Sequence, residues 1–170
     1  MYEDVRRIGP LTATIPPLEV AAAERALGLT FPPGYREFLA ELGLGTYCTV
    51  VMTFGPAMVM ERVQRDRQVW ANHYYWKNPE VLPQAELAYC VMTARTIEGD
   101  QIVLHSGRPE SVYILPRQVL EIHELPGDYR RVLDWIASAG VLYKPIQERY
   151  FQSIPSGDTR ATQGGEPGTG

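Results

Sequence analysis

Histidine is the residue type best suited to acid–base or metal chemistry, and this sequence has three: His73, His105 and His123. Zinc-binding histidines often lie in short spacings such as HExxH, and none of the three lies in such a pattern. Asp100 has the right type and spacing to orient His105 as a base. It follows Gly99, however, and Gly-Asp is a turn signal that explains this aspartate structurally. We therefore predict no catalytic residue, no metal and no cofactor.

Two further patterns suggest chemistry at first reading. Residues 43–46, Gly-Leu-Gly-Thr, resemble part of a phosphate-binding loop, but such a loop follows a strand and opens a helix. Here the glycines follow a predicted helix and precede a predicted strand, which favours a helix end and a turn. Residues 121–124 place two carboxylates beside a histidine, but in a strand Glu121 and Glu124 point to opposite faces. Both patterns are better explained by structure than by catalysis.

One segment stands apart because residues 70–76 place four aromatic side chains within seven positions. The preceding residues 61–69 have helical character. Successive residues of a helix point in different directions, so the aromatic side chains cannot all face one buried side. Tryptophan, tyrosine and arginine are enriched in protein-binding hot spots. We hypothesise a partner-binding surface with aromatic anchors and a basic rim, formed by Arg62, Arg65, Trp70, Tyr74, Tyr75 and Trp76.

Two alternatives for this aromatic segment stay open. The side chains could complete the core or cover a sheet edge, or they could stack on nucleic-acid bases. A formal charge of only +2 over residues 61–77 argues against nucleic acid. Alanine at Tyr75 and Trp76 separates the remaining two explanations, because a binding surface predicts weaker partner binding without unfolding.

The chain has 170 residues, 45% of them apolar, and a formal net charge of −4. Residues 1–150 carry the apolar periodicity and suffice for one domain with its own core. Residues 151–170 are rich in Gly, Pro, Ser and Thr and have little to bury, which predicts a flexible tail. This composition excludes a coiled coil, a collagen and a wholly disordered chain. The pI of about 5.4 argues against a nucleic-acid partner.

No membrane or export signal is evident in the sequence. The longest apolar stretch, residues 50–60, is interrupted by Gly55-Pro56 and is shorter than the ~20 residues of a membrane helix. The first seven residues mix both charge signs and lack the apolar core of a signal peptide. Cys48 and Cys90 lie in apolar segments, which predicts reduced core thiols. The expected location is the cytoplasm, with no membrane partner.

Helix signals occur at both ends of the predicted domain. Pro16-Pro17 and Gly28 delimit a first helix, and Pro32-Pro33 and Gly43 delimit a second. The second carries an apolar stripe at i, i+3, i+4 and i+7, formed by Tyr35, Phe38, Leu39 and Leu42. A last helix, with Asp128 as its N-cap and Gly140 as its end, repeats that stripe with Tyr129, Val132, Leu133 and Ile136.

The middle of the chain favours strands. Residues 46–54, 87–93, 101–105 and 112–115 are rich in β-branched or other apolar residues, and residues 119–123 form a weaker fifth candidate. The turn at Gly99-Asp100 and other short connections make neighbouring strands antiparallel. We therefore predict an α+β fold with N-terminal helices, a central antiparallel twisted sheet of about four to six strands, and a C-terminal helix packed on the sheet.

The order of these motifs resembles the SUKH superfamily. The first helix ends at Leu27-Gly28, Phe31-Pro32 follows, and Tyr35, Phe38 and Leu39 match the "Y..FL" pattern before a glycine-rich turn at Gly43. The Gly99-Asp100 hairpin and the last helix are similar to later motifs of the family, so the resemblance spans about residues 15–139. Two features depart from the pattern: Gly43-Leu44-Gly45 replaces the usual Asn-Gly-Gly, and residues 60–86 are unusually aromatic.

The resemblance implies a binding protein rather than an enzyme. Many bacterial members of this superfamily are immunity proteins that bind a polymorphic toxin, often a nuclease, and fungal relatives regulate cell-wall assembly through protein contacts. The matched residues Tyr35, Phe38, Leu39, Gly43, Gly99 and Asp100 carry over as fold determinants. The expected function is therefore neutralisation of a toxin domain by occlusion. A regulatory or scaffold protein is the first alternative, and an enzyme whose site is assembled from distant residues is the second.

Overall fold

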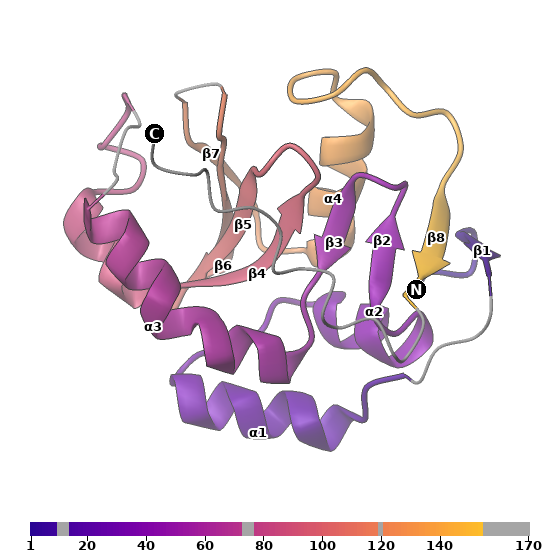
Figure 1. Ribbon diagram of the computed structural model, residues 1–170, viewed down its shortest axis with the longest axis horizontal. Helices are drawn as coiled ribbons and strands as arrows, with labels where there is room; N and C mark the ends of the chain where they lie inside the picture. The colour runs from indigo at the N-terminus through magenta and orange to yellow at the C-terminus, as the bar shows by residue number, and fades with distance from the viewer. Residues whose placement is uncertain (10–13, 73–76, 119–120, 155–170) are drawn as a thin grey trace, which may run out of the picture.

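Helical and extended segments alternate along the chain. A computed structural model describes residues 1–9, 14–72, 77–118 and 121–154 (Figure 1). Within these residues the helices are α1 (Pro17–Leu27), α2 (Tyr35–Glu41), α3 (Pro56–Asn72), the 3-10 helix η1 (Gln84–Tyr89) and α4 (Tyr129–Ser138). The strands are β1 (Arg6–Ile8), β2 (Gly45–Tyr47), β3 (Val51–Thr53), β4 (Cys90–Thr96), β5 (Gln101–His105), β6 (Arg108–Leu115), β7 (His123–Pro126) and β8 (Tyr150–Ser153).

The predicted ends of the first and last helices are confirmed, whereas the second helix starts at Tyr35, with Gly34 as its N-cap, and not at Pro32-Pro33. The helix α1 starts with Pro17 and is closed by Gly28, whose φ of 65° is the left-handed conformation that glycine adopts most easily. The helix α4 has Asp128 as its N-cap, and this carboxylate accepts hydrogen bonds from the backbone N–H groups of Arg130 and Arg131. These local signals fix where the helices begin and end.

The described strands form one sheet in the order β1-β8-β2-β3-β4-β5-β6-β7. The predicted α+β class is confirmed, but the sheet has eight strands and is mixed, because β1 pairs in parallel with β8. Both of these strands are short and lack the alternating apolar pattern that predicts a strand, and all three residues of β1 are exposed. The parallel pair joins the two ends of the described chain.

Three local predictions need correction. Residues 46–54 form the hairpin of β2 and β3 and not one strand, since Cys48 and Thr49 have φ angles of 51° and 55° and make a tight turn. The strand expected at residues 119–123 is observed at His123–Pro126. The ordered domain also continues past residue 150, because β8 pairs with β2 and buries Phe151.

Helices cover both faces of the sheet (Figure 1). On one face, Trp70 of α3 donates a hydrogen bond to the side chain of Gln101 on β5. On the other face, Tyr47 of β2 donates to Asp134 of α4. The cross-strand register connects Gln101 to Thr46 through β4 and β3, and Thr46 and Tyr47 point to opposite faces because they are adjacent in a strand. The helices α3 and α4 therefore sandwich the sheet.

The residues of the "Y..FL" pattern lie in the core between α2, α4 and the sheet. Tyr35, Phe38 and Leu39 are fully buried. The ring of Tyr35 packs edge-on against Tyr129 at 5.2 Å between centroids, and Phe38 packs in the same way against Phe151 at 5.5 Å. The Tyr35 hydroxyl donates to the carbonyl of residue 54 at 2.6 Å. These side chains attach α2 to the rest of the domain.

Candidate functional site

The helix α3 presents a polar stripe to the sheet. Arg62, Asp66 and Trp70 are spaced four residues apart and therefore lie on one face of the helix. The guanidinium of Arg62 lies 5.1 Å from the ring centroid of Phe54 and donates to the Asp66 carboxylate at 3.2 Å. Asp66 and Trp70 are both buried, and Trp70 is only 2% exposed. The helix thus packs on the sheet through hydrogen-bonded polar groups as well as apolar ones.

The structure describes only part of the predicted surface around residues 62–76. Trp70 is part of the core and is not a surface anchor, because its ring is enclosed between α3 and β5 and its Nε1 is hydrogen-bonded at 2.6 Å to Gln101. Arg65 is exposed and Arg62 is half-buried, so both can reach a partner. The other predicted anchors, Tyr74, Tyr75 and Trp76, lie outside the described residues.

Asp100 has a structural environment. Its carboxylate accepts hydrogen bonds from the hydroxyls of Thr96 and Tyr143 and from the backbone N–H of Arg117. Gly99 precedes it with a φ of 95°, so this position favours glycine. Asp100 and His105 lie at opposite ends of β5, and neither is hydrogen-bonded to the other. The structure therefore does not bring this possible base and its orienting group together.

His105 belongs to a second polar group at the other end of β5. Its Nδ1 accepts a hydrogen bond from the backbone N–H of Gly107 at 3.0 Å, and its Nε2 lies 3.5 Å from the Glu86 carboxylate. Burial, followed by the charge of Arg108, lowers the pKa of His105 below its ordinary value. Arg108 also pairs with Glu86 and donates to the Tyr113 hydroxyl at 3.1 Å. This group links η1 to the end of the sheet.

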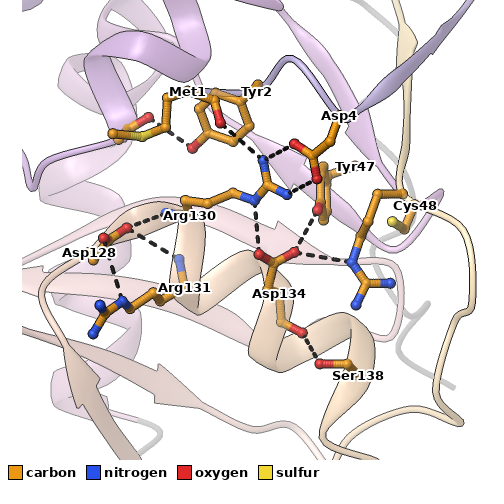
Figure 2. A network of polar contacts seen from close by, with 12 residues as sticks. Met1, Tyr2, Asp4, Tyr47, Cys48, Asp128, Arg130, Arg131, Asp134 and Ser138 are labelled. Atoms are coloured by element: carbon orange, nitrogen blue, oxygen red, sulfur yellow. Dashed lines mark hydrogen bonds and ion pairs between the residues drawn. The ribbon is translucent and has the colours of Figure 1, made fainter.

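The most extensive polar network surrounds Arg130 on α4 (Figure 2). Its guanidinium donates two hydrogen bonds to the carboxylate of Asp4, at 3.0 and 2.7 Å, and one to Asp134 at 2.8 Å. Asp134 also accepts from the Tyr47 hydroxyl and from Arg149. The hydrogen bonds from Arg130 are the main cause that lowers the pKa of Asp4, and burial is the main cause that raises the pKa of Tyr47.

Next to this network is an open surface depression of about 450 Å³, lined by Asp4, Arg6, Glu148 and Arg149. Arg6 and Glu148 form an exposed ion pair at 2.9 Å along its edge. The four lining side chains carry two positive and two negative charges. They balance one another, so the depression does not select strongly for an anion or a cation. Its lining residues have a structural role, because the ion pair of Arg6 with Glu148 connects the N-terminal segment to the residues just before β8.

Sequence reasoning missed the Arg130 network, although one part had a signal. Arg130 and Asp134 have the i, i+4 spacing of a helical ion pair. Their partners Asp4 and Arg149 come from the two ends of the domain, and only the pairing of β1 with β8 brings those ends together. No local pattern indicates such a contact.

The described residues offer little support for metal or thiol chemistry. Among them, no three His, Cys, Asp or Glu side chains gather closely enough to hold a metal ion. Cys48 and Cys90 are free and buried, as predicted, and burial raises the pKa of Cys90 to about 12. A thiol with such a pKa is a poor nucleophile near neutral pH. Within the same ranges, no helix combines the length and apolar character needed to cross a bilayer.

Comparison of the chain with protein-family models, with curated proteins and with solved structures finds no match in any of the three. A function must therefore be argued from the residues and the geometry described above.

Proposed function

We propose that this chain is a non-catalytic protein-binding domain of the SUKH type, and that it acts as an immunity protein that neutralises a toxin domain by occlusion. The observation that carries this proposal is the order of sequence motifs from residue 15 to residue 139. Arg62 and Arg65 on α3 are the proposed rim of the binding surface. Tyr74, Tyr75 and Trp76 remain its proposed anchors.

The positions of the motif residues support the proposal. Tyr35, Phe38 and Leu39 are buried where α2 meets α4 and the sheet. Gly43 ends α2 with a φ of 80°, and Gly99 makes the turn between β4 and β5 with a φ of 95°. Each of these residues has a role in packing or in a turn. That agrees with fold determinants, which is what the resemblance implies for them.

The engagement of the polar groups also favours binding over catalysis. The carboxylate of Asp100 accepts three hydrogen bonds, one from Thr96 in its own hairpin and two from Arg117 and Tyr143, which lie later in the chain. The Nδ1 of His105 accepts a hydrogen bond from Gly107, and Asp134 is shared by Arg130, Tyr47 and Arg149. Groups that are engaged in this way hold the domain rigid. A rigid surface suits an inhibitor that acts by covering an active site.

The proposal is tested by co-expressing the full chain with the toxin domain encoded next to its gene. We expect the chain to restore growth and to form a stable complex with that domain in size-exclusion chromatography. The double variant Tyr75→Ala and Trp76→Ala should fold like the wild type and fail in both assays. A matched exposed change on the opposite helix, Arg131→Gln, should leave both assays unchanged.

Two outcomes contradict the proposal. If the chain binds the neighbouring protein but does not restore growth, it is a regulator or scaffold. If the double variant unfolds, these aromatic side chains belong to the core and the binding surface must lie elsewhere. Circular dichroism of each purified variant distinguishes unfolding from a loss of binding.

A further inference from the structure

Part of the sheet face that α3 packs against is left uncovered by helices. One cross-strand row crosses this face from β1 to β5, and the register connects its members directly. Trp70 of α3 covers the end of the row at Gln101. The remaining five residues, which we call the open row, are exposed or half-buried: Ile8, Gln152, Thr46, Met52 and Arg95.

Positive charge gathers where the open row meets α3. The charges of Arg62 and Arg65 on α3 and of Arg95 on β4 all act on one carboxylate, that of Asp66. We call these three arginines the arginine cluster. Asp66 is buried and is hydrogen-bonded to Arg62 alone among the described residues. Three guanidinium groups and one carboxylate leave a formal excess of +2 at this place.

Within the ranges that the structure describes, two arginines of the cluster keep unused hydrogen-bond donors, although Arg62 is paired with Asp66 through another nitrogen. The Nε of Arg62 is buried and has no hydrogen-bond acceptor among the described residues. Among the described residues, the side chain of Arg95 also has no hydrogen-bond or ion-pair partner, although it is half-buried. Burial and the nearby charge of Arg62 lower the pKa of Arg95 below its ordinary value. An added anion would relieve this uncompensated charge.

We propose that the open row and the arginine cluster bind an acidic polypeptide segment of the protein partner, with a carboxylate held by Arg62, Arg65 and Arg95. Arginine suits this task, because its planar group presents several donors to a carboxylate. The uncharged side chains of Thr46, Met52 and Gln152 would lie beneath the rest of the segment. The choice of a polypeptide rests on the proposed function, whereas the anion site rests on the charges.

Charge also favours a polypeptide over nucleic acid. An excess of +2 matches one or two acidic side chains, while a nucleic acid brings a continuous row of phosphates. The whole chain has a net charge of −4, which opposes such a polyanion outside this small site. A short acidic segment avoids that repulsion because it meets only the local charge.

The test titrates the isotope-labelled full chain with a blocked triglutamate peptide at low salt and follows arginine Nε–Hε and backbone signals by NMR. We expect the signals of Arg62 and Arg95 to shift most, because their guanidinium groups gain an acceptor. Arg95→Gln and Arg65→Gln should each weaken binding about fivefold, the size of one partly exposed ion pair. Arg65 is exposed, so its variant keeps the test valid even if Arg95→Gln unfolds.

The control is Arg131→Gln, which removes the same charge from α4 on the other face of the sheet. Its affinity for the peptide should equal that of the wild type. The proposal is overturned if Arg131→Gln weakens binding as much as Arg65→Gln, or if the arginine cluster shows no shift. It is also overturned if a thymidine oligonucleotide of equal charge binds the same arginines more tightly. No toxin is used, so this result is independent of the growth assay.

Discussion

His105 shows how one side chain makes stability depend on pH. Its folded pKa is lower than the ordinary value of 6.5, so the unfolded chain binds a proton more readily than the folded one. The contribution of His105 to the free energy of unfolding should therefore be fully present above pH 6.5 and decline as the pH falls below it. In urea unfolding at a series of pH values, His105→Asn should flatten this decline, because its amide oxygen can still accept from Gly107 and does not titrate. An unchanged pH profile would contradict the prediction.

Arg130 is the residue whose loss should cost the most among the surface charges. It donates to both Asp4 and Asp134, and its guanidinium lies 5.1 Å from the ring centroid of Tyr2. Replacement by glutamine removes the ion pairs to Asp4 and Asp134, although Asp134 keeps Arg149, and should lower the free energy of unfolding by about 1–3 kcal/mol. The matched variant Arg131→Gln, at a position with 76% side-chain exposure, should change it by less than about 0.5 kcal/mol. Urea denaturation measures both values.

The ion pair between Arg130 and Asp4 also predicts how stability changes in acid. The pKa of Asp4 is lowered from 3.8 by Arg130, so its ion pair stabilises the fold above pH 3.8 and is lost as the pH falls through the lowered value. The free energy of unfolding should therefore fall less steeply below pH 3.8 in Arg130→Gln than in the wild type. Equal slopes in acid titrations followed by circular dichroism would contradict this role.

At the residue scale, sequence reasoning succeeds where one local period decides the environment. The apolar stripes of α2 and α4 are buried as predicted, because helical spacing alone places them on one face. The prediction of Trp70 as a surface anchor is wrong, because Trp70 lies on the buried face of α3 together with Val63 and Asp66. No local pattern in the sequence indicates a role for Arg95. Its role depends on Met52 and α3, which only the folded sheet brings beside it.

At the element scale, the pairing of β2 with β8 depends on a close approach at Gly45. An added Cβ at this position would overlap the carbonyl oxygen of Gln152 and the ring of Phe151. Gly45→Ala should lower the free energy of unfolding by about 3 kcal/mol or more. Gly28→Ala is the control, because nothing lies within 4 Å of its added Cβ. It should cost only about 1 kcal/mol for its left-handed backbone. Equal losses would contradict the packing argument.

Elements with strong local signals were predicted, and elements that depend on distant partners were not. The strand β5 was expected at its observed bounds, and β4 and β6 overlap their expected ranges, since hairpins need only short-range pairing. The strands β1 and β8 have three and four residues; β1 pairs only with β8, and β8 depends on distant partners in both β1 and β2. Their sequences carry no apolar alternation that would reveal this.

At the scale of the whole molecule, β8 joins the two ends of the domain to its centre. It pairs with β1 on one side and β2 on the other, and it supplies Phe151 to the aromatic core. A chain that ends after Arg149 loses these contacts and leaves β1 without a neighbour. Its free energy of unfolding should fall by about 3–5 kcal/mol or more, the loss expected when one buried phenylalanine is removed.

A chain that ends after Ile154 keeps β8 and provides the matched comparison. The composition of residues 155–170 offers almost no apolar surface to bury, so we expect this chain to melt at the same temperature as the full-length protein. Differential scanning calorimetry of the three chains measures both expectations. If the chain that ends after Arg149 also melts at the full-length temperature, β8 does not hold the sheet together. If the chain that ends after Ile154 melts lower, residues 155–170 contribute to stability and are more than a tail.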